Sequence, residues 1–271
     1  MDKYAVIGHP IEHSKSPLIH SEFARLTGQP LEYHAILAPK AGFADAVKQF
    51  RQAGGKGANV TLPFKEEALA LCDELSERAR RAGAVNTLIW NDDERLLGDN
   101  TDGLGLVSDL KRHAYPLRDA RILLLGAGGV ARGVLLPLLS ERPKRLVVAN
   151  RTAHKAERLA ADFSSFGPVT GVGLENLDGT FDLVINGTSA SLSGKLPDLH
   201  RVKLAEDGCA YDMAYGDSLT PFQCWALENG ARHALSGLGM LVGQAAESFA
   251  LWRGVHPPIE PILELLQGEV E

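Results

Sequence analysis

The sequence has few cysteines, no long apolar run and no excess of positive charge. Its three cysteines, Cys72, Cys209 and Cys224, are widely spaced and include no C-x-x-C pair. This favours reduced thiols over a disulfide framework or a zinc site. No apolar run reaches the length of a transmembrane helix, and the first residues lack the apolar core of a signal peptide. We therefore expect a cytoplasmic protein without a membrane segment.

The charge and the histidines exclude two further classes. A net charge of −6 argues against a general nucleic-acid-binding protein, whose surface would need an excess of Lys and Arg. The histidines near the start, His9, His13, His20 and His34, share no metal-ligand spacing on any one element. At 271 residues, 45% of them hydrophobic, the chain is long enough for one large globular domain or two ordinary ones.

The strongest motif lies between residues 121 and 133. Residues 122–125 form a short apolar run that predicts a buried strand, and residues 129–141 predict a helix. Between them, Gly126, Gly128 and Ala131 fit the G-x-G-x-x-G/A pattern of dinucleotide-binding proteins. In that pattern the glycines let a pyrophosphate approach the backbone, and the free N–H groups of the helix point at the phosphates. The context favours a dinucleotide site over a purely structural turn.

The end of the next expected strand, residues 145–149, bears on the choice of dinucleotide. Proteins that prefer NAD usually carry an acidic residue about 20 residues after the glycines. Here Asn150 is followed by Arg151, with Thr152 and Lys155 close by. An acid would repel a 2′-phosphate, whereas a guanidinium can bind one through two hydrogen bonds. We therefore expect NADP, and we consider a merely solvated charge the weaker interpretation of Arg151.

Strand-like and helix-like segments alternate along the rest of the chain, which favours an α/β fold with a parallel, helix-covered sheet. The expected strands are residues 3–8, 31–37, 56–61, 181–186 and 208–213, with a hairpin formed by residues 87–90 and 95–97. The expected helices are residues 18–27, 43–53, 64–72, 75–82, 218–229 and 239–252.

Three polar clusters follow expected strands, at the edge where open α/β sheets bind ligands. The first holds Ser14 and Ser16. Ser16 precedes Pro17 and would be a helix N-cap, yet the two hydroxyls would equally suit a carboxylate at the helix N-terminus. Both interpretations stay open.

The second cluster holds Asn59 and Thr61 on one side of a strand, and Lys65 in the first turn of the next helix. A lysine there opposes the helix dipole, which makes it a functional candidate, although its long side chain can reach solvent. The third cluster holds Asn86 and Asp102, which could instead form a turn and a helix cap. A lysine and an aspartate facing one pocket suit proton transfer. Spacing alone does not show that Lys65 and Asp102 meet.

Taken together, the motifs resemble those of the shikimate dehydrogenase family along nearly the whole chain. The matching segments are residues 14–17, 59–65, 83–87, 98–103, 126–131, 150–152, 186–189, 211–213 with Tyr215, 220–222 and 237–245. The resemblance implies a Rossmann-type NADP domain at residues 103–236. It also implies an α/β substrate domain built from residues 1–102 and the returning C-terminal helices of residues 237–271. The implied reaction is the NADPH-dependent reduction of 3-dehydroshikimate to shikimate, a step of aromatic amino-acid biosynthesis.

The resemblance also implies roles for single residues and no metal. Lys65, paired with Asp102, would give and take the proton. Residues implied to bind substrate are Ser14, Ser16 and Tyr215 for the carboxylate, and Asn59, Thr61, Asn86, Asp102 and Gln244 for the ring hydroxyls. Residues implied to bind the cofactor are Gly126, Ala127, Gly128, Gly129, Val130, Ala131, Asn150, Arg151, Thr152, Lys155, Thr188, Met213 and Gly237. A monomer or a homodimer would fit.

The sequence departs from the family pattern at two places. Lys155 stands where the family often has arginine, and Ala190-Ser191 stand where it usually has a serine–glycine pair. One alternative is a quinate/shikimate dehydrogenase that uses NAD or both cofactors, against which Asn150 and Ser16 argue. Another is a catalytically inactive relative that senses a metabolite, against which the intact Lys65 and Asp102 argue.

Overall fold

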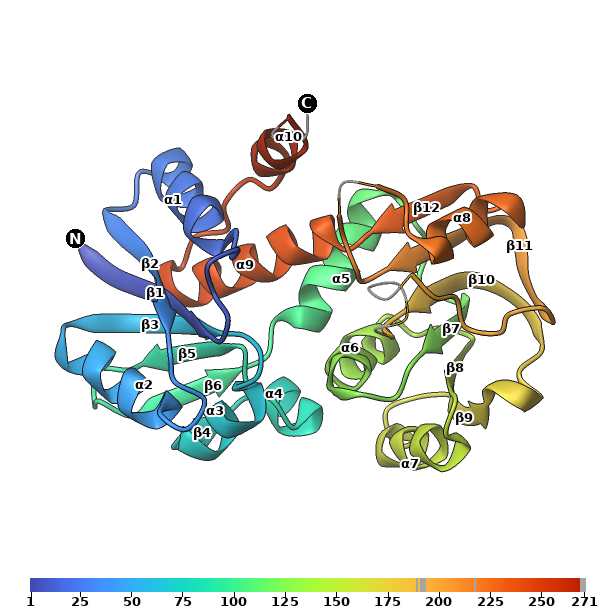
Figure 1. Ribbon diagram of the computed structural model, residues 1–271, viewed down its shortest axis with the longest axis horizontal. Coiled ribbons are helices and arrows are strands. Elements are labelled where there is room, and N and C mark those ends of the chain that lie inside the picture. Colours follow the sequence, from blue (N-terminus) through green and yellow to red (C-terminus); the bar gives the residue numbers. More distant parts are fainter. Residues whose placement is uncertain (189, 191–193, 217, 269–271) are drawn as a thin grey trace. The chain divides into compact units, whose positions relative to one another are not determined.

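The computed structural model describes residues 1–188, 190, 194–216 and 218–268 (Figure 1). The chain divides into two compact units, Met1–Gly105 with Leu241–Glu271, and Leu106–Met240. The first unit therefore consists of two segments far apart in sequence, and the second is continuous. The division falls a few residues after the expected boundaries at residues 102 and 236.

The first unit is built on a mixed six-stranded sheet of order β2-β1-β3-β5-β6-β4. The expected hairpin is present as β5 and β6, and β5 runs antiparallel to both of its neighbours. The hairpin makes this half of the sheet mixed, because the short turn between β5 and β6 permits only antiparallel pairing. The strands are β1 (Asp2–Gly8), β2 (Leu31–Leu37), β3 (Gly55–Val60), β4 (Glu74–Leu75), β5 (Thr87–Trp90) and β6 (Leu96–Asp99).

Helices cover both faces of this sheet (Figure 1). On one face the rings of Phe43 and Phe64 stack 4.8 Å apart in the core formed with α2 and the start of α3. On the other face His20 of α1 stacks on Tyr33 of β2, with ring centroids 4.2 Å apart. The helices of this unit are α1 (Ser16–Thr27), α2 (Phe43–Gln52), α3 (Lys65–Leu71), α4 (Glu77–Ala82), α9 (Leu238–Arg253) and α10 (Glu260–Gly268), with α9 beginning in the second unit.

One expected helix begins two residues late. Residue 75 was expected to be helical, but Leu75 belongs to β4 and pairs with Gly98 of β6. Ser76 then caps α4, because its Oγ accepts a hydrogen bond of 3.1 Å from the backbone N of Ala79. The N-cap therefore sets the true start of the helix.

The second unit contains six parallel strands in the order β12-β11-β10-β7-β8-β9. Counted from β7, this is the strand order of the doubly wound dinucleotide-binding fold. The strands are β7 (Arg121–Leu125), β8 (Arg145–Asn150), β9 (Val169–Gly173), β10 (Gly179–Asn186), β11 (Val202–Asp212) and β12 (His233–Ser236). The helices are α5 (Asp102–Arg112, beginning in the first unit), α6 (Gly129–Ser140), α7 (Ala153–Phe163) and α8 (Pro221–Glu228), with a 3-10 helix at Leu174–Asn176.

The burial of strand β7 on both faces explains its apolar run. Ile122 and Leu124 are buried in a core on one face of the sheet, and Leu123 and Leu125 are buried in a core on the other. A strand covered by helices on both faces needs apolar residues at every position. The strand order reverses between β7 and β10, and such folds bind ligands at the carboxyl ends of the strands at this point. None of the helices within the described ranges is long and apolar enough to cross a bilayer.

Candidate active site

In the first unit, Lys65 and Asp102 form an ion pair. The ammonium of Lys65 donates a hydrogen bond of 2.6 Å to Oδ2 of Asp102. Lys65 is the first residue of α3 and Asp102 is the first residue of α5. Their side chains are 25% and 13% exposed, so the pair is mostly shielded from solvent but accessible to a ligand. The carboxylate offsets the unfavourable position of an ammonium at a helix N-terminus.

Asn86 donates a hydrogen bond to the other oxygen of the Asp102 carboxylate. Its Nδ2 donates a hydrogen bond of 2.8 Å to Oδ1 of Asp102 and lies 3.3 Å from Oε1 of Gln244. Its own Oδ1 accepts a hydrogen bond of 2.9 Å from the backbone N of Thr101. The structure thus gathers Lys65, Asn86, Asp102 and Gln244 from four separate segments into one cluster of acid, base and amide groups.

Asn59 lies beneath this cluster and is only 5% exposed. Its Oδ1 accepts a hydrogen bond of 2.7 Å from the hydroxyl of Tyr33, and its Nδ2 donates to the backbone O of Asn86 over 3.1 Å. The geometry makes Asn59 a support for Asn86, and a contact with substrate remains a prediction. Thr61 follows β3 at the same edge, where its methyl group lies so close to Gly8 that a Cβ on Gly8 would be 2.4 Å away.

Ser14 and Ser16 lie at the amino end of α1. Ser16 is not the N-cap: it is the first helical residue, and the N-cap is Lys15, whose side chain makes no capping hydrogen bond. Instead Oγ of Ser14 accepts a hydrogen bond of 3.3 Å from the backbone N of Ser16. The helix therefore starts one residue earlier than the Ser-Pro pair indicates. The positive end of the α1 dipole is next to both hydroxyls, which suits a carboxylate.

The sequence interpretation missed Ser248 of α9, which is fully buried. Its Oγ lies 2.9 Å from Nδ2 of Asn59, 2.8 Å from Oγ1 of Thr87 and 3.2 Å from Oγ1 of Thr101. Ser248 is four residues after Gln244, on the same face of the helix. Two polar residues at this spacing in an otherwise apolar helix were the signal that could have revealed this buried network.

In the second unit, the loop after β7 has the geometry that a dinucleotide needs. Gly126 has a φ of +106°, a region that favours glycine. An added Cβ at Gly128 or Gly129 would meet no atom within 4 Å, so a ligand can approach the backbone there. Helix α6 begins at Gly129 without a side-chain cap, and Ala131 is fully buried against the sheet. Ala127 is half-buried and Val130 is 44% exposed.

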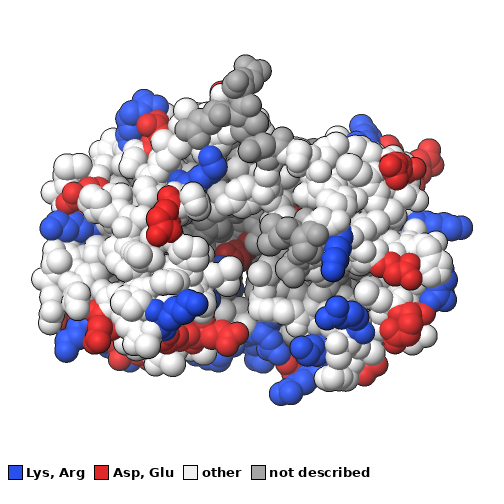
Figure 2. Space-filling view, viewed as in Figure 1, with Lys and Arg blue, Asp and Glu red and all other residues white. Residues whose placement is uncertain are grey.

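The residues expected to select NADP surround the end of β8. Asn150 ends the strand, and its Nδ2 donates a hydrogen bond of 3.1 Å to the backbone O of Thr152. Arg151 and Lys155 are both exposed, and the first turn of α7 contains no acidic residue. On the face shown in Figure 2, Lys and Arg side chains gather over α6 and α7. This end of the sheet therefore offers positive charge to a phosphate.

Thr188, Met213 and Gly237 follow β10, β11 and β12 at the same edge of the sheet. Asn186 anchors the first of them, because its Oδ1 accepts hydrogen bonds from both the backbone N and the hydroxyl of Thr188. An added Cβ at Gly237 would lie 2.1 Å from the backbone O of Met213, so only glycine fits there. Tyr215 follows β11 and is 44% exposed. Ser191, part of the departure at residues 190–191, lies outside the described residues.

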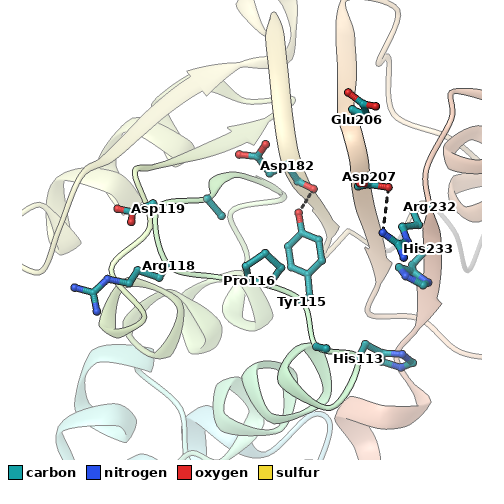
Figure 3. A pocket seen from close by; sticks show the side chains of 12 residues that line it. His113, Tyr115, Pro116, Arg118, Asp119, Asp182, Glu206, Asp207, Arg232 and His233 are labelled. Carbon is teal, nitrogen blue, oxygen red and sulfur yellow. Dashed lines mark hydrogen bonds and ion pairs between the residues drawn. The ribbon is translucent and has the colours of Figure 1, made fainter.

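A cavity of about 530 Å³ lies at the opposite edge of this sheet (Figure 3). It is lined by the segment between α5 and β7, by Asp182 of β10, by the middle of β11 and by the start of β12. Arg232 donates a hydrogen bond to Asp207 over 3.2 Å within it, and Tyr115 points its hydroxyl at the backbone O of Asp182. It is distinct from the Gly126 loop, which follows the carboxyl end of β7. Among the described residues no cluster of His, Cys, Asp and Glu could hold a metal ion.

Comparisons with known proteins agree with this geometry. Three family models match the chain: the shikimate dehydrogenase substrate binding domain at residues 6–88, shikimate / quinate 5-dehydrogenase at residues 109–193, and the shikimate 5′-dehydrogenase C-terminal domain at residues 237–267. A shikimate dehydrogenase (NADP(+)) of Aeromonas salmonicida is 57% identical over 267 residues, which is 98% of each chain. One of Vibrio atlanticus is 54% identical over 271 residues, which covers 100% of this chain and 98% of the relative.

Solved structures give the same result. An Ael1 enzyme from Pseudomonas putida matches with a TM-score of 0.90 and 47% identity over 98% of both chains. Shikimate 5-dehydrogenase from Thermus thermophilus, in complex with NADP(H) and shikimate, matches with a TM-score of 0.85 and 35% identity over 97% of this chain and 98% of the other. The α/β fold class and the family resemblance are both confirmed. This chain belongs to the shikimate dehydrogenase family.

Proposed function

We propose that this chain catalyses the reversible, NADP-dependent interconversion of 3-dehydroshikimate and shikimate, a step of aromatic amino-acid biosynthesis, with Lys65 and Asp102 as its acid/base pair. The observation that carries the proposal is the 2.6 Å hydrogen bond between these two side chains, within a cluster that also holds Asn86 and Gln244. The Aeromonas and Vibrio relatives bear the name of this activity at more than half identity over nearly the whole chain.

The reaction needs a proton donor and acceptor at one oxygen. Reduction of a ketone adds a hydride to the carbon and a proton to the oxygen, so the group beside that oxygen must donate a proton and recover it in the reverse direction. The ammonium of Lys65 can donate to the 3-keto oxygen of 3-dehydroshikimate and can take the proton back from the 3-hydroxyl of shikimate. Asp102 orients the ammonium by accepting one of its hydrogen bonds, and Asn86 fixes the carboxylate from the other side.

Other residues of the first unit would bind the remainder of the substrate. Ser14 and Ser16 would hold the carboxylate at the amino end of α1, where the helix dipole favours an anion. The ring hydroxyls would contact Asn86, Asp102 and Gln244, with Thr61 at the edge of the same sheet. Asn59 would contribute through Asn86, to whose backbone it donates. Tyr215, which belongs to the second unit, would assist at the carboxylate.

The second unit would bind the cofactor, and the residues present fit it. NADP supplies or accepts the hydride. The loop of residues 126–131 would hold the pyrophosphate, because Gly128 and Gly129 leave their backbone open to a ligand. Arg151 and Lys155 would pair with the 2′-phosphate, with Asn150 and Thr152 beside them. Thr188, Met213 and Gly237 would border the nicotinamide.

A steady-state comparison tests this function. We expect kcat/KM for shikimate to be highest with NADP⁺ and far lower with NAD⁺. We expect kcat/KM for quinate to be lower than either of these values, with both cofactors. Equal values with NAD⁺ and NADP⁺ would favour the quinate/shikimate alternative. Tight binding of NADPH without turnover of 3-dehydroshikimate would instead favour the metabolite sensor.

A further inference from the structure

One buried carboxylate near the acid/base pair has no role in the function proposed above. Asp99 ends β6, and its side chain is only 8% exposed. Its Oδ2 accepts a hydrogen bond of 2.6 Å from Nη2 of Arg78. Its Oδ1 accepts hydrogen bonds from Nε of Arg78 at 3.2 Å, from the hydroxyl of Ser76 and from the backbone N of Asn100 at 2.7 Å. A buried charge of this kind is tolerated because each oxygen is paired.

The residues that Asp99 joins lie on two segments that both lead to the acid/base cluster. Ser76 and Arg78 lie at the start of α4, the helix that ends just before the segment containing Asn86. Asp99 and Asn100 lie on the segment that leads from β6 into Asp102. The carboxylate therefore fastens the segment of Asp102 to the element that precedes Asn86.

Hydrogen bonds carry this connection to the two functional side chains. The backbone O of Asp99 accepts a hydrogen bond of 3.0 Å from the backbone N of Asn86. The side chain of Asn100 accepts one of 3.2 Å from the backbone N of Asp102 and donates one of 3.1 Å to the backbone O of Ala84. Asn86 is thus one hydrogen bond from Asp99, and Asp102 is two hydrogen bonds from it, through Asn100.

We propose that Asp99 and Arg78 are positioning residues of the Lys65–Asp102 pair, an inference that rests on the proposed function. Their paired hydrogen bonds hold the segments of Asn86 and Asp102 at a fixed separation, so that the carboxylate of Asp102 faces the ammonium of Lys65. Neither residue needs to touch the substrate. The effect on catalysis is through geometry, since small displacements of acid/base groups cost large factors in rate.

The test compares Asp99→Asn with the wild type. The amide keeps the shape of the side chain but presents a donor to the guanidinium of Arg78, which breaks the paired hydrogen bonds between the two residues. We expect kcat for shikimate oxidation to fall roughly 10- to 100-fold, while KM for NADP⁺ stays within about twofold because the nucleotide loop belongs to the other unit. NADPH titration counts the folded molecules, and kcat is expressed per binding site so that lost protein is not scored as lost catalysis.

A second variant and a matched control sharpen the test. Arg78→Met should lower kcat to a similar degree, Arg78→Lys should restore part of it, and the double variant with Asp99→Asn should be no slower than the slower single variant. Asp182→Asn is the control, because Asp182 forms an equivalent two-bond pair with Arg121, at 2.6 and 2.9 Å, in the second unit. That variant should keep its kcat.

The outcomes separate the inference from the function on which it rests. If the wild type oxidises shikimate and both Asp99→Asn and Arg78→Met keep a normal kcat, the inference is overturned and the function stands. A fall in kcat that is equally large in Asp182→Asn would also overturn it, since the effect would then be general destabilisation. A wild-type protein that does not oxidise shikimate with NADP⁺ would overturn both.

Discussion

Lys65 and Asp102 are joined by a hydrogen bond of 2.6 Å although each is the first residue of its own helix. Helices α3 and α5 therefore both begin at the acid/base cluster, and each supplies one member of the pair. The proposed proton transfer therefore depends on where these two helices start. Short local sequences determine those starting points. The arrangement also means that either side chain can be removed without disturbing the interior of a helix.

The first prediction concerns the proton donor. Lys65→Ala should lower kcat by roughly 10²- to 10⁴-fold, because the general acid and its positive charge are both lost. KM for shikimate should change little, since the other residues proposed to bind the ring and the carboxylate remain. Steady-state kinetics in the direction of shikimate oxidation measures both constants. Lys48→Ala, an exposed lysine on α2 of the same unit, is the control. A near-normal kcat in Lys65→Ala would remove Lys65 from the mechanism.

The second prediction concerns the choice of cofactor. Arg151→Ala should raise KM for NADP⁺ by roughly 10- to 100-fold, because a charge-assisted contact with the 2′-phosphate is worth about 1.5–3 kcal/mol. KM for NAD⁺, which has no 2′-phosphate, should be unchanged. Arg158→Ala provides the matched control, since Arg158 is an exposed arginine within α7. Equal losses with NADP⁺ and NAD⁺ would show that Arg151 acts on the loop and not on the phosphate.

The third prediction concerns the pH dependence of stability. His20 is fully buried among Phe23, Tyr33, Phe249 and Trp252. Burial lowers the pKa of its imidazole from 6.5 to about 3. The unfolded chain therefore binds a proton between pH 6.5 and about 3 that the folded protein does not, so stability falls as the pH is lowered through that range. One such group changes the free energy of unfolding by up to about 1.4 kcal/mol per pH unit.

Urea unfolding from about pH 7.5 to about pH 4.5 measures this contribution. His20→Phe should show a shallower loss of stability below pH 6.5 than the wild type, because phenylalanine binds no proton in the unfolded state. Above about pH 7 the free energy of unfolding should vary with pH equally in the two proteins. Identical slopes below pH 6.5 would mean that the imidazole does not resist protonation in the folded protein.

The fourth prediction concerns thiol reactivity. Burial raises the pKa of the thiols of Cys72 and Cys209 to about 12, so almost no thiolate is present at about pH 8. Cys224 is exposed on α8. A chromogenic disulfide reagent should titrate one thiol rapidly in the native protein and three after denaturation. Cys224→Ser should abolish the rapid phase, and a rapid phase that survives in this variant would contradict the assignment.

The elements that sequence patterns predicted well are those with a local cause. The apolar run at β7 follows from its burial on both faces, and Gly126 follows from its positive φ, so both leave a clear mark in the sequence. The helix expected at residues 18–27 starts two residues late, and the Ser-Pro pair indicates a start one residue late, because α1 is Ser16–Thr27. A Ser-Pro pair fits an N-cap followed by proline, but here Ser14 and not Ser16 provides the acceptor hydroxyl, and the two cases differ only in backbone geometry.

Other features depend on partners far away in the chain and could not be predicted. Leu75 is a strand residue only because Gly98 of β6 is beside it. Strand β9 was not expected, because residues 169–173 carry two glycines and acquire their strand form from pairing with β8. The buried contact of Ser248 with Asn59 spans 189 residues of sequence. Local propensity carries no information about such pairs, which tertiary packing decides.

The two-segment construction of the first unit has a consequence for biosynthesis. On the ribosome, Lys65 and Asp102 emerge before the second unit, whereas Gln244 and Ser248 emerge after it. The second unit is one continuous stretch and can fold while translation proceeds, since domains generally fold as units in order of synthesis. The first unit is complete only with α9, because Ser248 and Gln244 of this helix are the last partners that Asn59 and Asn86 acquire. The proposed acid/base pair is thus translated early, whereas the cluster around it is completed last.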